Sequence, residues 1–105
     1  MAEVASGILK IKDGEVAPVN LQNCSYDSGG SDIQHGKFKI EFTSTSSNMP
    51  IILTSLYGGE HDTHNVVVNI PDFENSNLLN NKEFYLYAQY SNKTSVHGIA
   101  FQVHQ

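Results

Sequence analysis

The chain is built of short segments with the alternation of β-strands, and this pattern limits it to all-β folds. The clearest segment is Lys37–Phe42, in which apolar and charged residues alternate without exception. A period of two puts Phe38, Ile40 and Phe42 on one face of a strand and the charged side chains on the other. No stretch predicts a helix of about ten residues or more. Each strand must therefore bury its apolar face against another sheet.

The end of the sequence, Lys82–Gln105, predicts two more strands, Phe84–Tyr90 and Val96–His104. Both are rich in the aromatic and β-branched residues that favour strands. The polar segment 91–95 between them is typical of a turn.

Four further strands are predicted, at Ser6–Lys12, Val16–Leu21, Pro50–Tyr57 and His64–Ile70. The dipeptide Asp13-Gly14 is a strong turn signal between the first two. Pro18 limits the second strand to a sheet edge or a strand end. The dense apolar run of Pro50–Tyr57 predicts a more central strand.

Residues 23–36 and 72–81 are predicted to be loops, since both are polar and have little to bury. A loop as long as the first is often functional in a compact domain. With 105 residues, the chain is long enough for one core and too short for two. The predicted fold is a single domain over residues 1–105, an all-β antiparallel β-sandwich of about six to seven strands, or a small barrel.

Charge and composition argue against several classes of partner. The net charge is −5 with only 6 Lys and Arg, so a basic patch for nucleic acid or for an anionic membrane is not expected. No apolar run approaches the ~18 residues of a membrane span, so no membrane insertion is expected. Met1–Val4 lacks the features of a signal peptide, which predicts a cytoplasmic protein or one secreted by a signal-peptide-independent route. The lone Cys24 cannot form an internal disulfide.

Catalytic motifs are missing from the sequence. There is no Gly-x-Ser-x-Gly elbow and no phosphate-binding loop, and no His stands near Cys24 in a way that suggests an activated thiol. We therefore expect a protein that is not an enzyme and needs no cofactor.

Residues 60–64, Glu-His-Asp-Thr-His, place four potential metal ligands in five positions. Oxygen and imidazole ligands could hold Zn²⁺ or a harder cation. The segment lacks the helix that puts a His-x-x-His pair on one face, so a solvated hairpin tip is the simpler interpretation. The same side chains could serve a polar ligand as hydrogen-bonding groups.

The polar tip that begins at Tyr90 has two interpretations, a solvated hairpin or part of a sugar site. A pyranose has an apolar face that stacks on an aromatic ring and vicinal hydroxyls that take paired hydrogen bonds. Tyr90 could supply the ring, and neighbouring loops the polar groups. The candidate carbohydrate-binding residues are Asp32, His61, Asp62, Asn65, Tyr90 and Asn92.

Tyr85 and Tyr87 alternate with Phe84, Leu86 and Ala88, so one face of this strand carries tyrosines. The tyrosines could form a subunit interface or a binding surface. They could also belong to a core with phenol groups at its solvated rim, which is the common arrangement for buried tyrosine.

From about residue 36 onward the chain resembles the H-type lectin domain of snail agglutinins and slime-mould discoidins. The resemblance covers roughly two-thirds of the chain. It rests on three strand patterns and the C-terminal segment: Phe38-x-Ile40-x-Phe42, Pro50-Ile51-Ile52-Leu53-x-Ser55, Asn65-Val66-Val67-Val68 and Asn92-x-Thr94-x-Val96-His97-Gly98-Ile99-x-Phe101-x-Val103. It implies a trimeric antiparallel β-sandwich that binds galactose or N-acetylgalactosamine through loops near subunit boundaries.

Carried over by position, the family's aspartate matches Asp32, and its arginine falls at Asn65, which lacks the charge and reach. The family's Trp-His pair falls at Ser91-Asn92, so the stacking ring is missing there and Tyr90 is the candidate substitute. The family's remaining two aromatic positions, one on the final strand and a terminal Trp, fall at His97 and Val103. These departures bear more on sugar specificity than on the fold.

Galectin-type and legume-type lectin sandwiches are the alternative architecture, although the galectin Trp signature is absent because the chain has no Trp. The predicted function is a hemagglutinin-like lectin that binds glycans or glycoproteins and gains avidity as a homo-oligomer, a trimer if it follows the H-type family. The alternative is a non-catalytic adhesion or protein-interaction module that uses the tyrosine-bearing face.

Overall fold

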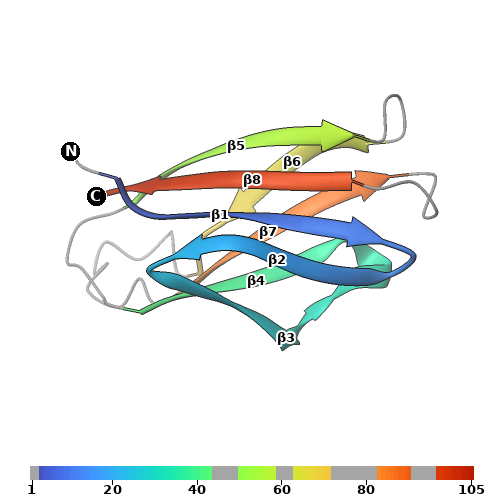
Figure 1. Ribbon diagram of the computed structural model, residues 1–105, viewed down its shortest axis with the longest axis horizontal. Coiled ribbons are helices and arrows are strands. Elements are labelled where there is room, and N and C mark those ends of the chain that lie inside the picture. The colour runs from blue at the N-terminus through green and yellow to red at the C-terminus, as the bar shows by residue number, and fades with distance from the viewer. Residues whose placement is uncertain (1–2, 44–49, 59–62, 72–82, 91–96) are drawn as a thin grey trace.

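The computed structural model describes residues 3–43, 50–58, 63–71, 83–90 and 97–105, with the backbone alone at residues 58, 63–65, 89 and 90. These residues form a sandwich of two four-stranded antiparallel sheets (Figure 1). The first sheet has the order β2 (Glu15–Gln22), β1 (Glu3–Lys12), β8 (His97–His104), β5 (Ile51–Gly58). The second has the order β3 (Cys24–Asp32), β4 (Lys37–Phe42), β7 (Glu83–Tyr90), β6 (Thr63–Asn69), and the 3₁₀ helix η1 (Ile33–His35) joins β3 to β4.

The predicted all-β antiparallel sandwich is confirmed, with eight described strands instead of about six to seven. The strand predicted at Lys37–Phe42 is β4 with the same bounds, and the strand predicted at Phe84–Tyr90 is β7 with one more residue at its start. Within the described ranges, no helix is long and apolar enough to cross a membrane.

The core lies between the sheets and consists of the inward-facing side chains of the strands. Its largest fully buried members come from four central strands: Leu9, Ile11, Phe38, Ile40, Phe84, Leu86, Ile99, Phe101 and Val103. The ring of Phe84 in β7 meets the ring of Phe101 in β8 edge-on, with 5.6 Å between centroids. This contact joins the two sheets, because β7 and β8 lie in different layers.

The β1–β2 hairpin forms as the sequence predicts. Lys12 pairs with Glu15, so the loop has two residues, Asp13 and Gly14, with φ values of 52° and 77°. Two successive left-handed residues make a type I′ turn, whose twist matches that of the strands. Pro18 lies in β2, an outer strand of its sheet, as its missing N–H requires.

The prediction of a loop at residues 23–36 is wrong, because most of it is β3. Cys24 and Tyr26 point toward the core while Ser25 and Asp27 point outward, in register with β4. The pairing then shifts between Asp27 and Asp32, across the glycine-rich segment. The local sequence of β3 does not favour a strand, but its pairing with β4 supplies backbone hydrogen bonds that stabilise one.

The prediction that Pro50–Tyr57 forms a more central strand is also wrong. β5 is the outermost strand of its sheet and pairs with β8 alone. Its outer face exposes large apolar side chains, with Ile51 48%, Leu53 55% and Tyr57 52% exposed. A dense apolar run is found both in strands that are buried on both faces and in exposed edge strands, so it does not distinguish the two positions. Residues 72–81, the second predicted loop, lie outside the described residues.

Candidate functional site

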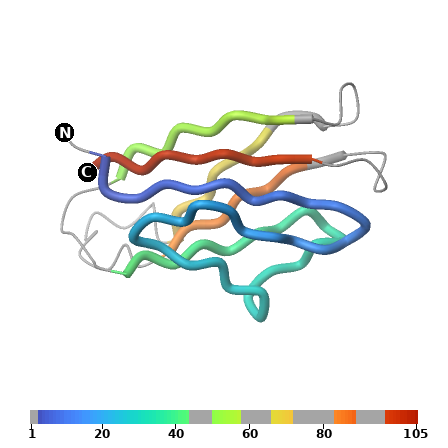
Figure 2. The backbone as a smooth tube through the Cα atoms, viewed as in Figure 1, coloured from blue at the N-terminus to red at the C-terminus, as the bar shows by residue number. Residues whose placement is uncertain are grey.

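One end of the sandwich brings together the strands that carry the described residues of the predicted sugar site, Asp32, Asn65 and Tyr90. We call it the Asp32 end: the β1–β2 turn, η1, the last residues of β5 and β7, and the first residues of β6 and β8. Within each sheet the strand register sets which ends meet, since Thr63 pairs with Tyr90 in the second sheet and His97 with Gly58 in the first. In Figure 2 it is the right-hand end, and the first and last described residues lie at the left.

Asp32 lies at this end as the N-cap of η1. One of its carboxylate oxygens accepts a long hydrogen bond of 3.4 Å from the backbone N–H of His35, and the other lies 2.7 Å from Nδ1 of the His35 ring. The side chains are 50% and 80% exposed, respectively. The hydrogen bond from His35 lowers the pKa of the Asp32 carboxyl below its usual value, so the group is ionised at neutral pH.

Gly36 attaches this short helix to β7. Its backbone oxygen accepts a hydrogen bond of 2.9 Å from the N–H of Ala88. Gly36 has a φ of 69°, and a Cβ there would overlap the carbonyl oxygen of Ala88. Only glycine meets both conditions, the left-handed backbone and the close approach. The hydrogen bond between Gly36 and Ala88 fixes the C-terminal end of η1 on β7. Asp32 itself is separated from β7 by β4, since it pairs with Lys37, which pairs with Tyr87.

The other sequence-predicted site residues are placed only in part. Tyr90 ends β7, and Asn65 lies in β6 where the pairing with β7 shifts between Thr63 and Val66. Both are therefore close to the Asp32 end in the backbone. Their side chains are not described, and His61, Asp62 and Asn92 lie outside the described residues, as does most of the proposed metal segment 60–64. Their roles stay predictions.

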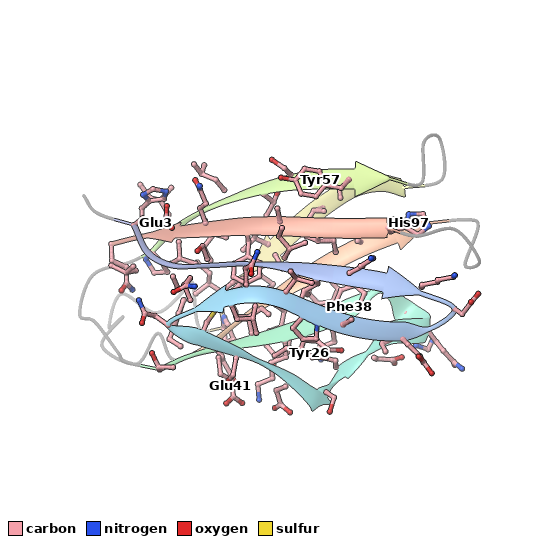
Figure 3. All side chains as sticks on the ribbon, in the orientation of Figure 1. Glu3, Tyr26, Phe38, Glu41, Tyr57 and His97 are labelled. Atoms are coloured by element: carbon pink, nitrogen blue, oxygen red, sulfur yellow. The ribbon has the colours of Figure 1, made fainter. Side chains whose placement is uncertain are left out.

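His97 is a residue at this end whose burial the sequence did not reveal. It begins β8 on the inner face, is 1% exposed and lies between Ile11 and Gly58 in the sheet. Figure 3 shows it at the right-hand end of β8, opposite the end marked by Glu3. The alternation of β8 from Ile99 onward could have placed it inward, but a histidine at a strand start gave no signal of its own.

Lys39 forms an ion network on the outer face of the second sheet that the sequence does not predict. Its Nζ lies 3.0 Å from Glu83, 3.2 Å from Asp27 and 3.4 Å from Glu41. Hydrogen bonds to Glu83 and Asp27 raise the pKa of Lys39, and the bond with Lys39 lowers the pKa of Asp27. The three carboxylates come from β3, β4 and β7, so the network links strands. Among the described residues, no group of side chains is arranged to hold a metal ion.

Tyr85 and Tyr87 also lie on the outer face of the second sheet, because the residues that alternate with them are buried. Their ring centroids are 6.4 Å apart, and Nζ of Lys37 lies 4.6 Å from the centre of the Tyr85 ring. Val67, which pairs with Tyr87, is 60% exposed. The interpretation of these tyrosines as part of the core is wrong; an interface or a binding surface fits their position.

Asp32 and His35 have half or more of their side-chain surface exposed, and neither lines either of two hollows that described residues form. One of about 330 Å³ lies between Ile52 and residues 68–70, and one of about 480 Å³ lies along the β1–β2 hairpin. The candidate site is thus an exposed rim and not an enclosed pocket. A rim offers few groups to each ligand, so single sites would bind weakly.

Comparison with protein-family models, curated proteins and solved structures gave no match to this chain. The chemistry and geometry of the Asp32 end and of the outer sheet faces are therefore the observations that bear on its function.

Proposed function

We propose that the protein is a non-catalytic lectin of the hemagglutinin type. Its ligands are terminal glycans of the galactose or N-acetylgalactosamine class, bound through the loops of the Asp32 end. The observation that supports this most is Asp32, an ionised, half-exposed carboxylate at the N-cap of η1. The C-cap of the same helix, Gly36, is hydrogen-bonded to Ala88 of β7, the strand that ends at Tyr90.

The chemistry of the Asp32–His35 pair suits sugar hydroxyls. A carboxylate has about four acceptor positions, and the bonds with His35 use one on each oxygen. The free positions can accept hydrogen bonds from two vicinal hydroxyls. Bonds to a charged acceptor are stronger than those between neutral groups. In this proposal Tyr90 provides the ring for the apolar sugar face, and Asn65, His61, Asp62 and Asn92 provide further polar contacts.

Multivalency completes the proposal, because an exposed rim site binds weakly on its own. Several copies in one assembly raise the avidity for a surface that displays many glycans. The resemblance to H-type lectins implies a trimer as that assembly, and sedimentation equilibrium distinguishes a trimer from a dimer formed through a sheet edge.

The test is a glycan array followed by calorimetric titration with the best simple sugar. Asp32→Asn removes the charge and one acceptor and keeps a residue that can cap η1. We expect it to weaken binding about tenfold or more. Glu3→Gln, which removes one carboxylate at the opposite end of the sandwich, is the matched control and should bind as the wild type does. Asn92→Ala should abolish binding and leave the fold intact.

A blank array at millimolar galactose, N-acetylgalactosamine, mannose and N-acetylglucosamine would contradict the proposal. Equal loss of affinity in Asp32→Asn and Glu3→Gln would contradict the site and leave sugar binding in place.

The second candidate function is an adhesion or protein-interaction module, and the outward position of Tyr85 and Tyr87 favours it. Tyrosines on the surface are enriched at protein interfaces, and Tyr85 and Tyr87 are half-buried on the outer face of their sheet. On this account Tyr85→Ser or Tyr87→Ser abolishes an assembly that sedimentation detects in the wild type, and glycan arrays stay blank.

A further inference from the structure

Among the residues that the structure describes, no strand pairs with the outer edge of β5 in the first sheet. β5 is the last strand in the order β2-β1-β8-β5 and forms its ladder with β8 alone (Figure 1). A strand at a sheet edge presents unpaired backbone N–H and C=O groups, which can pair with another strand.

The other three edge strands carry features that oppose such pairing. β2 contains Pro18, which lacks an N–H. β3 shifts its register between Asp27 and Asp32 and carries both carboxylates. β6 shifts its register between Thr63 and Val66. Shifts of this kind distort an edge and protect it from association.

β5 has none of these protections. Its pairing with β8 runs from Ile51 to Gly58 without a shift, and the segment contains no proline and no charged residue. Its outward side chains Ile51, Leu53 and Tyr57 are about half exposed. Tyr57 is labelled on this strand in Figure 3. A regular, apolar and uncharged edge is the kind that associates.

The distribution of charge favours a second copy of the chain as the partner. The chain carries a net charge of −5, and an identical copy carries the same. In the described part of the chain, every Asp, Glu and Lys lies on β1, β2, β3, β4, β7 or the β1–β2 turn, so β5, β6 and β8 carry no formal charge. Two like-charged molecules meet at the lowest electrostatic cost on this uncharged side.

We propose that β5 pairs antiparallel with β5 of a second copy, which joins the two first sheets into one continuous eight-stranded sheet. The contact is isologous, with the same strand on both sides of a two-fold axis. If the axis passes through Thr54, Ile51 lies opposite Tyr57 of the partner subunit and Leu53 opposite Ser55 of the partner subunit. Aromatic and β-branched residues in such cross-strand pairs stabilise antiparallel sheets.

The antiparallel pairing has a consequence for the proposed lectin, and this step alone depends on the proposed function. β5 ends at the Asp32 end, so the two Asp32 ends of the dimer face in opposite directions. A bivalent protein of this shape can link glycans on two separate surfaces, as agglutination requires.

Sedimentation equilibrium of the full chain from micromolar to near-millimolar concentration tests the interface. The wild type should show a monomer–dimer equilibrium. Leu53→Lys places two ammonium groups at the contact and should raise the dissociation constant about tenfold or more. Val67→Lys is the matched control, since Val67 is also a highly exposed apolar residue on an edge strand, in the other sheet. It should dimerise as the wild type does.

A wild type that stays monomeric at every concentration, or that forms a trimer, overturns the proposal. So does a Leu53→Lys variant that dimerises normally, or a Val67→Lys variant that is equally weakened. Ile51→Lys repeats the test at a second position, and the melting temperature of each variant shows that it is folded. Sugar affinity separates this proposal from the previous one: Leu53→Lys should keep its affinity for a simple sugar and lose agglutination.

Discussion

Gly36 holds the C-terminal end of η1, the helix that Asp32 caps, against β7. It combines a left-handed backbone with a close contact to the carbonyl oxygen of Ala88, whereas Gly14 has the same kind of backbone and nothing near its Cβ position. Gly14→Ala should cost about 1 kcal/mol of unfolding free energy, for the backbone alone. Gly36→Ala should cost about 2–4 kcal/mol, because the methyl group also forces η1 away from β7.

Urea unfolding of the two variants and the wild type measures this difference. Equal costs would show that the contact between Gly36 and Ala88 does not hold η1 in place. Loss of sugar affinity in Gly36→Ala, with Gly14→Ala unaffected, would link that contact to the site.

At the scale of single residues, the sequence identified Asp32 but not what holds it. A carboxylate in a glycine-containing loop is visible in the sequence, and its resemblance to the family's aspartate singled it out. His35 and Gly36 were not expected as its supports, because one acts through a turn of 3₁₀ helix and the other through a strand more than fifty positions away. Neither contact follows from local periodicity.

Lys39 acts at the scale of elements, because it connects β3, β4 and β7 through Asp27, Glu41 and Glu83. The pKa of Asp27 is lowered, so the stabilisation from this carboxylate is present above its usual value of 3.8 and is lost as the pH falls through the lowered pKa. The pKa of Lys39 is raised above 10.5, so its contribution is present below that pH and is lost as the pH rises through the raised value.

Lys39→Met should therefore lower the melting temperature most at pH 7, where it also leaves three carboxylates facing one another. The difference from the wild type should shrink in acid, as these carboxylates become protonated. Thermal melts across the pH range measure it, with Lys10→Met, an exposed lysine on β1, as the control. A destabilisation that is independent of pH would mean that Lys39 contributes by packing and not by charge.

Strands whose own residues alternate regularly were predictable from the sequence. Strands that form only because a neighbouring strand pairs with them were not. β4 and β7 follow from their own residues, since their apolar and polar positions alternate throughout. β3 was missed because its glycines and polar residues favour loops, and only its pairing with β4 makes it a strand. The place of β5 was missed because sheet order depends on which strands meet, and no pattern within one strand encodes that.

The two sheets are held together by aromatic contacts through the middle of the molecule, where Phe84 of β7 meets Phe101 of β8. Phe84→Ala should cost about 3–5 kcal/mol, as expected for a fully buried aromatic residue. Tyr85→Ala, the next residue on the outer face, should cost about 1 kcal/mol or less. Denaturant unfolding compares the two, and similar costs would contradict the assignment of inner and outer faces in β7.

In the whole molecule, the proposed sugar site and the proposed dimer contact lie on different parts of the surface. The Asp32 end carries the candidate sugar site, and the edge strand β5 carries the candidate dimer contact (Figure 1). The sugar site can therefore bind a glycan whether or not the β5 edge is paired with a second copy. The described residues of β5, β6 and β8 have no formal charge. Part of the site was predictable from the sequence. In an antiparallel sandwich, successive connections between strands lie alternately at the two ends, so every second loop is at the same end. The outward tyrosines and the open edge became visible only with the sheet order.

The most direct measurement of the central claim is a map of backbone amide chemical shifts during titration with the sugar that the glycan array selects, starting with galactose and N-acetylgalactosamine. Saturable shifts are expected for residues 32–37 and 88–90 and for the start of β6. Glu3, Asn23 and His104, at the opposite end, should not move. The absence of saturable shifts with any sugar, or shifts confined to the face of Tyr85 and Tyr87, would contradict the claim that the Asp32 end binds glycans.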